Sequence, residues 1–219
     1  MLAAAGRGER LSLDRPKAFA QLRGRPLLAE SLERLDGSEW IDAIVVAAPP
    51  DWEEPVILLA EELGCGKVVA AVAGGSSRAE SVRIGVGEVG EDAAVILVHD
   101  AARPLVSDAV IERLLAALNE GFDGAIPGLP LADTVKRVRD RTVAETLPRE
   151  ELTAVQTPQA FVATVLRAAA ASDEEATDCS ALVEARGGTV RVVEGDPRLV
   201  KVTTAADLAL VESWLDAGR

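Results

Sequence analysis

The sequence contains a single histidine, His99, and no tyrosine among its 219 residues. A catalytic pair of histidines and a histidine-rich metal site are therefore excluded. Cysteine is also scarce: Cys65 and Cys179 lie far apart without the spacing of metal ligands, so we expect both to be reduced thiols in a cytoplasmic protein. No apolar run approaches the roughly 20 residues that span a bilayer. Because Arg7 and Arg10 interrupt the apolar opening, we expect no signal peptide and no membrane association.

The sequence also has no excess of positively charged residues. The formal net charge is −13 and the sequence pI is about 4.6, which argues against a nucleic-acid partner. An anionic substrate must then be drawn in by a local cluster of cations. Lysine is rare, with only four residues in the chain: Lys17, Lys67, Lys136 and Lys201.

The order of apolar segments predicts the fold class. Strand-like runs at 41–48, 67–73, 93–98 and 189–193 alternate with helical patterns at 26–35, 56–63, 107–118, 161–171 and 204–214. A capping box at residues 77–80 predicts the start of another helix. This alternation favours an α/β fold with a doubly wound, mostly parallel sheet. With no internal repeat or linker, residues 1–219 are expected to form one domain.

Residues 130–150 break this pattern. The segments 135–138 and 142–147 are strand-like but rich in charged residues, and a hairpin turning at Asp140 and Arg141 fits them. Such a hairpin has little apolar surface and is marginal when isolated in water. We therefore expect a hairpin arm that leans on a second subunit. A loop folded back on its own domain is the alternative.

The opening stretch, residues 2–17, predicts a cradle for a nucleoside triphosphate. Gly6 and Gly8 allow a tight turn whose N–H groups can approach a phosphate. Arg10 and Lys17 add positive charge beside that turn. The stretch lacks the third glycine of the dinucleotide fingerprint and the ending of a P-loop. An ordinary turn remains the alternative.

Two further polar clusters follow strands, where open α/β sheets bind ligands. His99 and Asp100 come directly after the apolar run 93–98, and Asp100 suits a hard cation such as Mg²⁺, although it could instead cap the following turn. His99 is expected to orient this loop by hydrogen bonding. Lys201 lies late in a short strand and offers a compact charge for phosphate oxygens. No arrangement of serine, cysteine or histidine supports a covalent nucleophile. The glycine loop, the cations and the one metal-type carboxylate therefore indicate phosphoryl or nucleotidyl transfer.

Several of these pieces occur together in one known family, whose motifs run from end to end of the chain. The matching segments are Ala4-Ala5-Gly6-x-Gly8-x-Arg10, Pro16-Lys17, Gly74-Gly75-x-x-Arg78-x-x-Ser81-Val82, His99-Asp100-Ala101-Ala102-Arg103-Pro104, Asp133-Thr134-Val135-Lys136, Gln156-Thr157-Pro158-Gln159 with Phe161, Thr177-Asp178 and Lys201-Val202-Thr203. With them the sequence resembles the 2-C-methyl-D-erythritol 4-phosphate cytidylyltransferases of the non-mevalonate isoprenoid pathway. The resemblance implies a Rossmann-like nucleotidyltransferase sheet with a protruding β-hairpin dimerisation arm, and a homodimer.

The resemblance also implies roles for individual residues. CTP would bind at Ala4, Ala5, Gly6 and Gly8, with Gly74, Gly75, Ser81 and Ala101 completing its site. Arg10 and Lys17 would be catalytic, stabilising the pentacoordinate α-phosphate, and Asp100 would hold Mg²⁺. The sugar-alcohol phosphate would be bound by Arg103, Thr134, Arg149, Thr157 and Lys201, with Thr134 and Arg149 reaching over from a partner subunit.

Simpler roles remain open for some of these side chains. Arg10 could pair with a surface carboxylate, and Arg149 could be a solvated charge of the hairpin. Thr157 could be a turn hydroxyl before a proline, and Ser81 a satisfied polar residue of a helix.

The sequence departs from the family pattern at three places. The apolar strand that precedes the Ala-Ala-Gly loop is truncated, and Ala3 stands where a proline is usual. We expect the native start to lie upstream of Met1, with a different segment filling the gap as the alternative. Cys179 replaces an acidic residue, and Leu199 and Val200 replace an Asn-Ile pair. The alternatives are therefore a ribitol-5-phosphate cytidylyltransferase and a nucleotide-binding relative without turnover.

Overall fold

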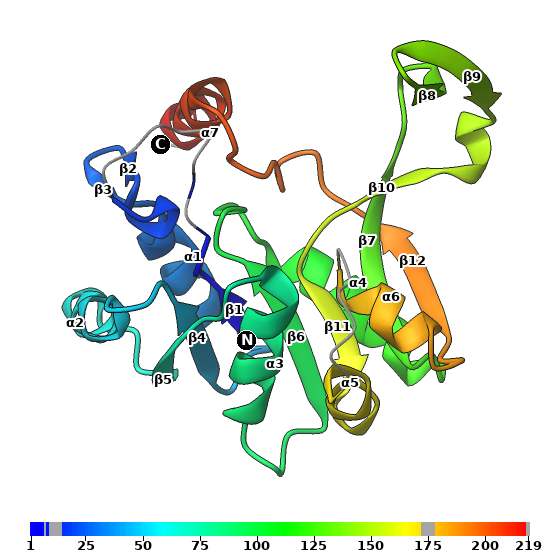
Figure 1. The fold of residues 1–219 in the computed structure, drawn as a ribbon. Helices are drawn as coiled ribbons and strands as arrows, with labels where there is room; N and C mark the ends of the chain where they lie inside the picture. Colours follow the sequence, from blue (N-terminus) through cyan, green and yellow to red (C-terminus); the bar gives the residue numbers. More distant parts are fainter. Residues whose placement is uncertain (7, 9–14, 172–177, 218–219) are drawn as a thin grey trace.

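The fold is built on one eight-stranded sheet. The computed structural model describes residues 1–6, 8, 15–171 and 178–217. Seven strands follow one another in the order β10-β7-β11-β6-β1-β4-β5, and the eighth, β12, pairs with β7 (Figure 1). Their bounds are β1 Leu2–Ala3, β4 Ile44–Ala48, β5 Val68–Ala73, β6 Val95–Asp100, β7 Gly124–Pro130, β10 Thr153–Val155, β11 Gln159–Val162 and β12 Val190–Glu194.

The sheet is mixed but mostly parallel. β1 runs parallel to both β4 and β6, β4 to β5, and β12 to β7. β11 runs antiparallel to its two neighbours, β6 and β7, and β10 is antiparallel to β7. The predicted doubly wound α/β sheet is therefore confirmed, with two antiparallel strands on the side that carries the arm.

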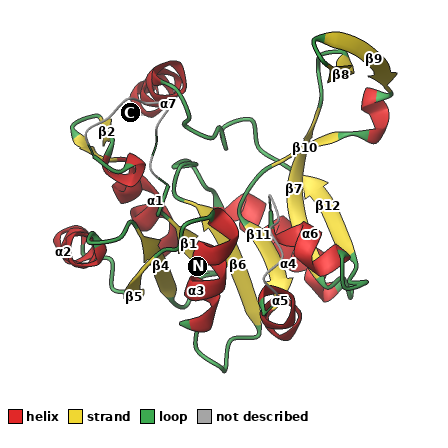
Figure 2. Cartoon of the chain, in the orientation of Figure 1, coloured by secondary structure: helices red, strands yellow, loops and turns green. Residues whose placement is uncertain are grey.

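Helices cover both faces of this sheet (Figure 2). They are α1 Leu27–Asp36, α2 Glu53–Leu63, α3 Arg78–Gly87, α4 Asp108–Asn119, α5 Ala163–Ala170, α6 Cys179–Glu184 and α7 Ala205–Ala217, with short 3₁₀ turns at Lys17–Phe19 and Arg149–Glu151. On one face, α1, α2 and α4 pack in a core with Val46 and Ala48. On the other, α3, α5 and α6 pack on Ile96 and Val98. No helix in these described ranges has the length and apolar character needed to cross a membrane.

The short first strand, β1, lies in the middle of the sheet. β1 has two residues, and Leu2 stands between Val46 of β4 and His99 of β6. The side chain of Leu2 is fully buried, and Ala3 lies beside Asp100. Short as it is, β1 therefore brings the loop that follows it next to the end of β6. An upstream start stays a prediction.

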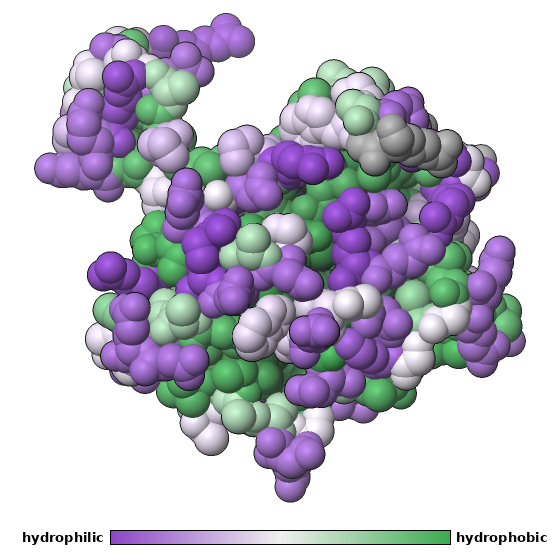
Figure 3. Space-filling view, turned by 180° about the vertical axis from the view of Figure 1, so that it is seen from behind, coloured by the Kyte–Doolittle hydropathy of each residue, from purple (hydrophilic) through white to green (hydrophobic). Residues whose placement is uncertain are grey.

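The arm is the predicted hairpin. β8 (Val135–Arg139) and β9 (Thr142–Leu147) form a separate two-stranded sheet that projects from the body (Figure 1). Asp140 and Arg141 both have positive φ, as a two-residue hairpin turn requires. Seen from behind, the arm carries mainly hydrophilic side chains (Figure 3). Val138 and Val143 pair across its strands, and both are more than half exposed.

Three sequence predictions need correction. The short strand expected to hold Lys201 is not formed: residues 199–203 belong to no strand, and the N–H of Val202 donates to the loop carbonyl of Ala102. The helix expected at 161–171 begins only at Ala163, because Phe161 and Val162 belong to β11. The strand expected at 41–48 begins at Ile44. The sequence analysis also missed β7, whose residues Gly124–Pro130 include two glycines and two prolines that read as a loop.

Candidate functional site

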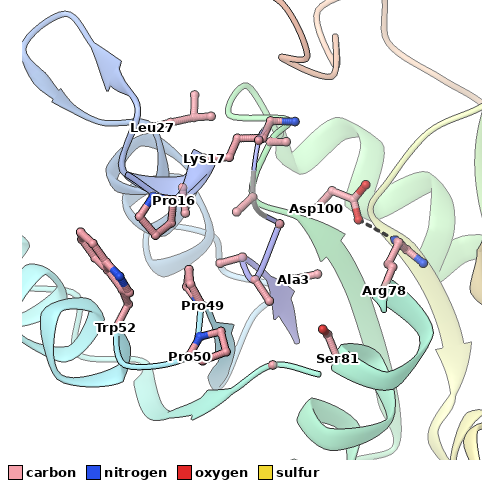
Figure 4. Close-up of a pocket in the computed structure, with 18 of the residues that line it drawn as sticks. Ala3, Pro16, Lys17, Leu27, Pro49, Pro50, Trp52, Arg78, Ser81 and Asp100 are labelled. Carbon is pink, nitrogen blue, oxygen red and sulfur yellow. Dashed lines mark hydrogen bonds and ion pairs between the residues drawn. The ribbon is translucent and has the colours of Figure 1, made fainter. Parts of the chain in front are cut away.

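A cleft of about 1210 Å³ opens at the carboxyl ends of β1, β4, β5 and β6 (Figure 4). Ala3 at the end of β1 lines it together with Ala4 and Ala5, and the Pro49-Pro50 pair lines it after β4. Gly74 and Gly75 follow β5, and Asp100 stands at the end of β6. This is where an open parallel sheet binds ligands, because the loops diverge there and leave a crevice.

The cleft brings most of the predicted site residues together. Those that line it are Ala4, Ala5, Gly6, Gly8, Lys17, Gly74, Gly75, Ser81, Asp100, Ala101 and Lys201. Arg10, the second predicted catalytic cation, lies outside the described residues. Segments far apart in the sequence thus meet in one hollow, as the predicted nucleotide site requires.

Glycine is required at two turns of this cleft. A Cβ on Gly74 would lie 2.4 Å from the Cβ of Ala5 and 3.1 Å from the carbonyl oxygen of Ala48. Gly8 has a φ of +70°, and a Cβ there would lie 2.7 Å from the Cβ of Lys17. The backbone therefore approaches itself so closely that any side chain would push the two loops apart.

The start of α3 shapes the loop after β5. Ser77 caps the helix by accepting from the N–H of Glu80 at 3.1 Å, as the capping box predicted. The hydroxyl of Ser81 donates to the Ser77 carbonyl at 2.8 Å and accepts from the N–H of Gly75 at 3.1 Å. Ser81 thus holds the glycine turn in place while it lines the cleft.

One wall of the cleft is apolar. Trp52 and the Pro49-Pro50 pair stand opposite Asp100, near Pro16 and Leu27 (Figure 4). The Trp52 ring packs on Phe19 with centroids 4.4 Å apart. Flat apolar surface of this kind suits a base or a sugar, whereas the opposite side suits phosphates. This wall was not among the site residues predicted from the sequence. The pattern Pro-Pro-x-Trp directly after a buried strand could have indicated it.

Asp100 is held between two cations. Nε of Arg78 donates to one carboxylate oxygen at 3.0 Å, and Nζ of Lys201 donates to the other at 2.6 Å. Burial alone would raise the pKa of Asp100, but the charges of Arg78 and Lys201 and their hydrogen bonds lower it well below its usual range. The carboxylate is therefore ionised at any physiological pH.

Behind Asp100, the buried imidazole of His99 accepts one hydrogen bond and donates another. Its Nε2 lies 3.0 Å from the carbonyl oxygen of Arg103, and its Nδ1 lies 3.1 Å from the hydroxyl oxygen of Thr157. That hydroxyl also accepts from the N–H of Asp100 at 3.0 Å. Burial lowers the pKa of His99 to about 4, so the ring is neutral. The expected hydrogen-bonding role of His99 in this loop is confirmed.

Arg103 joins the loop after β6 to two other segments. Its guanidinium donates to the carbonyl oxygens of Leu199 at 2.5 Å and Val155 at 3.4 Å. Its buried Nε has no hydrogen-bond partner among the described residues, and burial lowers the pKa of the group. The N–H of Val202 donates to the carbonyl of Ala102 at 2.8 Å, which fixes Lys201 beside the same loop.

The comparisons with known proteins agree with this geometry. Residues 1–217 match the family described as 2-C-methyl-D-erythritol 4-phosphate cytidylyltransferase. The chain belongs to this family. The resemblance drawn from the sequence motifs is thereby confirmed.

Relatives named 2-C-methyl-D-erythritol 4-phosphate cytidylyltransferase match nearly the whole chain. That of Frankia casuarinae is 46% identical, over 97% of this chain and 79% of the relative. That of Nocardia farcinica is 43% identical, over 99% of this chain and 93% of the relative. A cytidylyltransferase structure of that name from Thermus thermophilus superposes with a TM-score of 0.80 at 33% identity, covering 99% and 98% of the two chains. A 4-diphosphocytidyl-2C-methyl-D-erythritol synthase structure from Anaerococcus prevotii gives 0.83 at 27% identity, covering 98% and 96%.

Two of the predicted substrate-binding residues of this cytidylyltransferase family member lie on the arm. Thr134 and Arg149 are exposed, and neither lines the cleft of its own chain. Arg149 donates to the carbonyl of Ala132 and lies 3.6 Å from a carboxylate oxygen of Glu150. Their predicted contacts with substrate require a second copy of the chain and stay predictions.

Arg78, like the apolar wall, is a part of the site that was not predicted from the sequence. It stands in the family motif Gly74-Gly75-x-x-Arg78, from which no role for it was predicted. Besides Asp100, its guanidinium reaches the sulfur of Cys179 at 3.8 Å. Burial raises the pKa of the Cys179 thiol to about 11, so this neighbour is neutral. Asp100, not Cys179, is therefore the anionic partner of Arg78 at the cleft.

The donor set fits a magnesium ion that arrives with its nucleotide. Among the described residues, no group of three or more acidic, histidine or cysteine side chains is placed to bind a metal. Asp100 offers one ionised carboxylate at the cleft. Mg²⁺ commonly binds one or two carboxylates and takes its other ligands from phosphates and water. A single carboxylate is thus compatible with magnesium once a triphosphate is bound.

Proposed function

We propose that this chain transfers the cytidylyl group of CTP to 2-C-methyl-D-erythritol 4-phosphate. The products are 4-diphosphocytidyl-2-C-methyl-D-erythritol and pyrophosphate, and the step belongs to non-mevalonate isoprenoid precursor biosynthesis. The observation that carries the proposal is that the glycine turns, Lys17, Asp100 and Lys201 meet in one cleft. Family membership supports the choice of both substrates.

The reaction is an in-line displacement at phosphorus. A phosphate oxygen of the sugar alcohol forms a new bond to the α-phosphorus of CTP. The bond between the α-phosphorus and the bridging oxygen breaks, and pyrophosphate leaves with that electron pair. Negative charge gathers on the α-phosphate oxygens, and Lys17, together with Arg10, stabilises it. No covalent enzyme intermediate is needed, so positioning and charge provide the catalysis.

CTP lies with its phosphates over the opening loop and its base toward the second glycine turn. Ala4, Ala5, Gly6 and Gly8 surround the phosphates, whereas Gly74, Gly75, Ser81 and Ala101 complete the nucleotide site. Asp100 would hold Mg²⁺, which would neutralise charge on the triphosphate. Since Asp100 is already ionised and accessible from the cleft, no proton has to leave it first.

The sugar-alcohol phosphate lies on the side of Lys201 and Arg103. Thr134 and Arg149 are contributed by the arm of a second copy, so the active form is a homodimer. Each protomer is one nucleotidyltransferase domain with residues 130–150 as its arm. The enzyme acts in the cytoplasm, where the two free cysteines, Cys65 and Cys179, stay reduced.

Pyrophosphate release by the purified chain tests the proposal. CTP and Mg²⁺ are supplied with either 2-C-methyl-D-erythritol 4-phosphate or ribitol 5-phosphate, and the other nucleoside triphosphates replace CTP in parallel reactions. We expect release with CTP and the methylerythritol phosphate, and much less in every other combination. A preference for ribitol phosphate would overturn the substrate assignment. Tight CTP binding without release in any mixture would indicate a relative that binds nucleotide without turnover.

A further inference from the structure

Lys201 lies on a segment that belongs to no strand or helix. Residues 195–203 follow the end of β12 at Glu194 and precede the start of α7 at Ala205. Lys201 nevertheless lines the cleft, and its Nζ lies 2.6 Å from a carboxylate oxygen of Asp100. Because the strand ends before this segment, other contacts must fix the position of Lys201.

A buried glutamine makes two of these contacts. The side chain of Gln156 is 5% exposed, and it lies against the backbone of Asp196. Its Nε2 donates to the Asp196 carbonyl at 2.9 Å, and its Oε1 accepts from the Asp196 N–H at 3.0 Å. A carbonyl oxygen can only accept and an N–H can only donate, so these partners determine the orientation of the amide. The amide therefore pairs with Asp196 as a residue of an antiparallel strand would.

The residue before Asp196 must be a glycine for this pairing to form. A Cβ on Gly195 would lie 2.4 Å from Oε1 of Gln156 and 3.0 Å from the carbonyl oxygen of Gly128. The N–H of Gly195 donates to that same carbonyl at 2.9 Å, and the N–H of Gln156 donates to the carbonyl of Pro127 at 2.8 Å. Both partners are thus attached to neighbouring residues of β7.

A short turn connects the pairing at Asp196 with Lys201. The Asp196 carbonyl that accepts from Gln156 also accepts from the N–H of Leu199 at 2.9 Å. Leu199 is fully buried, so the turn cannot shift without displacing this side chain from the core. Lys201 follows two residues later. Its place along the chain is therefore set by the pairing at Asp196.

The loop after β6 holds the other side of the segment. The guanidinium of Arg103 donates to the Leu199 carbonyl at 2.5 Å. The N–H of Val202 donates to the Ala102 carbonyl at 2.8 Å. Lys201 stands between these two contacts. The segment is thus attached to β7 at one end and to the loop after β6 at the other.

We propose that Gln156 is a positioning residue that sets Lys201 at the cleft for the phosphate of the sugar alcohol. This inference rests on the proposed function, in which Lys201 binds that phosphate. Gln156 is not among the described residues that line the cleft, so it acts through the backbone of residues 195–203. The long stem of a lysine is flexible, and a displacement of about 1 Å in a positioning contact can cost up to about 100-fold in rate. The backbone position of Lys201 therefore matters for binding.

Hydrogen exchange tests the pairing without any ligand. Mass spectrometry of peptides that cover residues 195–203 measures how fast their N–H groups exchange. Gln156→Met, which keeps the size of the side chain but removes its amide, should speed up exchange in this segment about tenfold or more. Gln21→Met, the same change at an exposed glutamine of β2 (Gln21–Leu22), should leave it unchanged. Equal exchange in the wild-type chain and Gln156→Met would overturn the proposal.

Kinetics test the consequence for the substrate. Gln156→Met should raise KM for 2-C-methyl-D-erythritol 4-phosphate about tenfold and change the Kd for CTP by less than about twofold. In a Lys201→Met background, which lacks the positioned ammonium, the same change should raise KM by less than about threefold. A tenfold rise in both backgrounds, or an equal loss of CTP affinity, would show a general role in folding and would contradict positioning.

Two further variants separate the amide from its volume. Gln156→Glu places a carboxylate oxygen against the Asp196 carbonyl, so we expect a rise in KM at least as large as that of Gln156→Met. Gly195→Ala inserts a Cβ against Oε1 of Gln156 and should give the same pattern. It carries the test if Gln156→Met does not fold. Wild-type KM values in both variants would overturn the proposal.

The exchange experiment also separates this inference from the proposed function. It needs neither substrate nor turnover. If no sugar phosphate supported pyrophosphate release but exchange changed as expected, the error would lie in the proposed function and not in the pairing of Gln156 with Asp196. If release occurred and exchange did not change, the proposed function would stand and the positioning role would be wrong.

Discussion

The floor of the cleft and the arm use charged side chains in opposite ways. At the floor, Asp100 is nearly buried and accepts from Arg78 and Lys201. On the arm, Arg137 and Glu145 pair at 2.9 Å with side chains 52% and 53% exposed. Exposed pairs contribute little to stability because water screens them and the side chains lose freedom. Breaking a buried pair leaves a charge without compensation and is strongly destabilising.

This contrast separates two kinds of functional surface. The floor is preorganised: its polar groups are held by the protein before any ligand arrives. The arm carries exposed charged residues, and its valines Val138 and Val143 are more than half exposed in the described part of the chain (Figure 3). We therefore expect changes in the floor to alter chemistry and stability, and changes in the arm to alter association.

The largest effect is expected from Lys17→Ala. Loss of one charge at the α-phosphate should lower kcat about 100- to 1000-fold, as removal of one preorganised donor does in other enzymes. The far-UV spectrum and the unfolding midpoint should stay close to those of the wild-type chain. Lys67→Ala is the matched control, since Lys67 donates to the Ser38 carbonyl away from the cleft. Equal turnover by both variants would contradict the catalytic role.

Lowering the pH should destabilise the folded chain through His99. The pKa of this imidazole is about 4 in the folded chain, compared with an ordinary value of 6.5 once the chain unfolds. The unfolded chain therefore binds a proton first as pH falls, and stability is lost between pH 6.5 and 4 by about 3 kcal/mol in all. Urea unfolding at several pH values measures this loss. His99→Gln should have a shallower slope in this window, and parallel curves would contradict the buried neutral ring.

A smaller effect is expected at the second glycine turn. Gly74→Ala forces its Cβ against Ala5 and the Ala48 carbonyl, so the loops that surround the nucleotide must separate. We expect the Kd for CTP in calorimetry to rise about tenfold, which is about 1.4 kcal/mol. Gly66→Ala is the control, because a Cβ there meets nothing within 4 Å. If both variants bind CTP like the wild type, the close approach is unimportant for the site.

The smallest effect on folding is expected on the arm. The double variant Val138→Lys, Val143→Lys replaces the exposed pair of valines on the arm by two charges. The unfolding free energy of the protomer should change by less than about 0.5 kcal/mol per site. Sedimentation should nevertheless show monomers, in contrast to the homodimer that we propose for the wild type. Val69→Lys, on the exposed edge strand β5, should leave the dimer intact. Persistent dimers in the arm variant would contradict the proposed interface.

The sequence predicts those parts of the fold whose pattern is local. Continuous apolar runs identify β4 and β6, and helical periodicity identifies α1 and α4, because burial on both faces or on one face leaves a direct trace. β7 was missed since Gly and Pro dominate Gly124–Pro130, and tertiary pairing with β11 and β12 overrides their low strand propensity. The start of α5 was misplaced because Phe161 and Val162 fit a short buried strand and a helix equally well.

The sequence predicted which residues belong to the site, but not which side chains contact one another there. Gly74, Lys17 and Asp100 could be selected from their motifs, and the structure brings them to one cleft. The hydrogen bond between Thr157 and His99, 58 positions apart, depends on the antiparallel register of β11, which no local pattern encodes. Arg78 likewise acquires its partner only when the start of α3 meets the end of β6.

The packing of Trp52 against Phe19 gives the cleft a natural optical reporter. Trp52 lines the cleft, whereas Trp40 and Trp214 do not. The emission of an indole ring depends on the polarity around it, so a nucleotide entering beside Trp52 alters the fluorescence of the chain. Occupancy of the cleft can therefore be followed in the unlabelled protein, with Trp52→Phe as the silent reference.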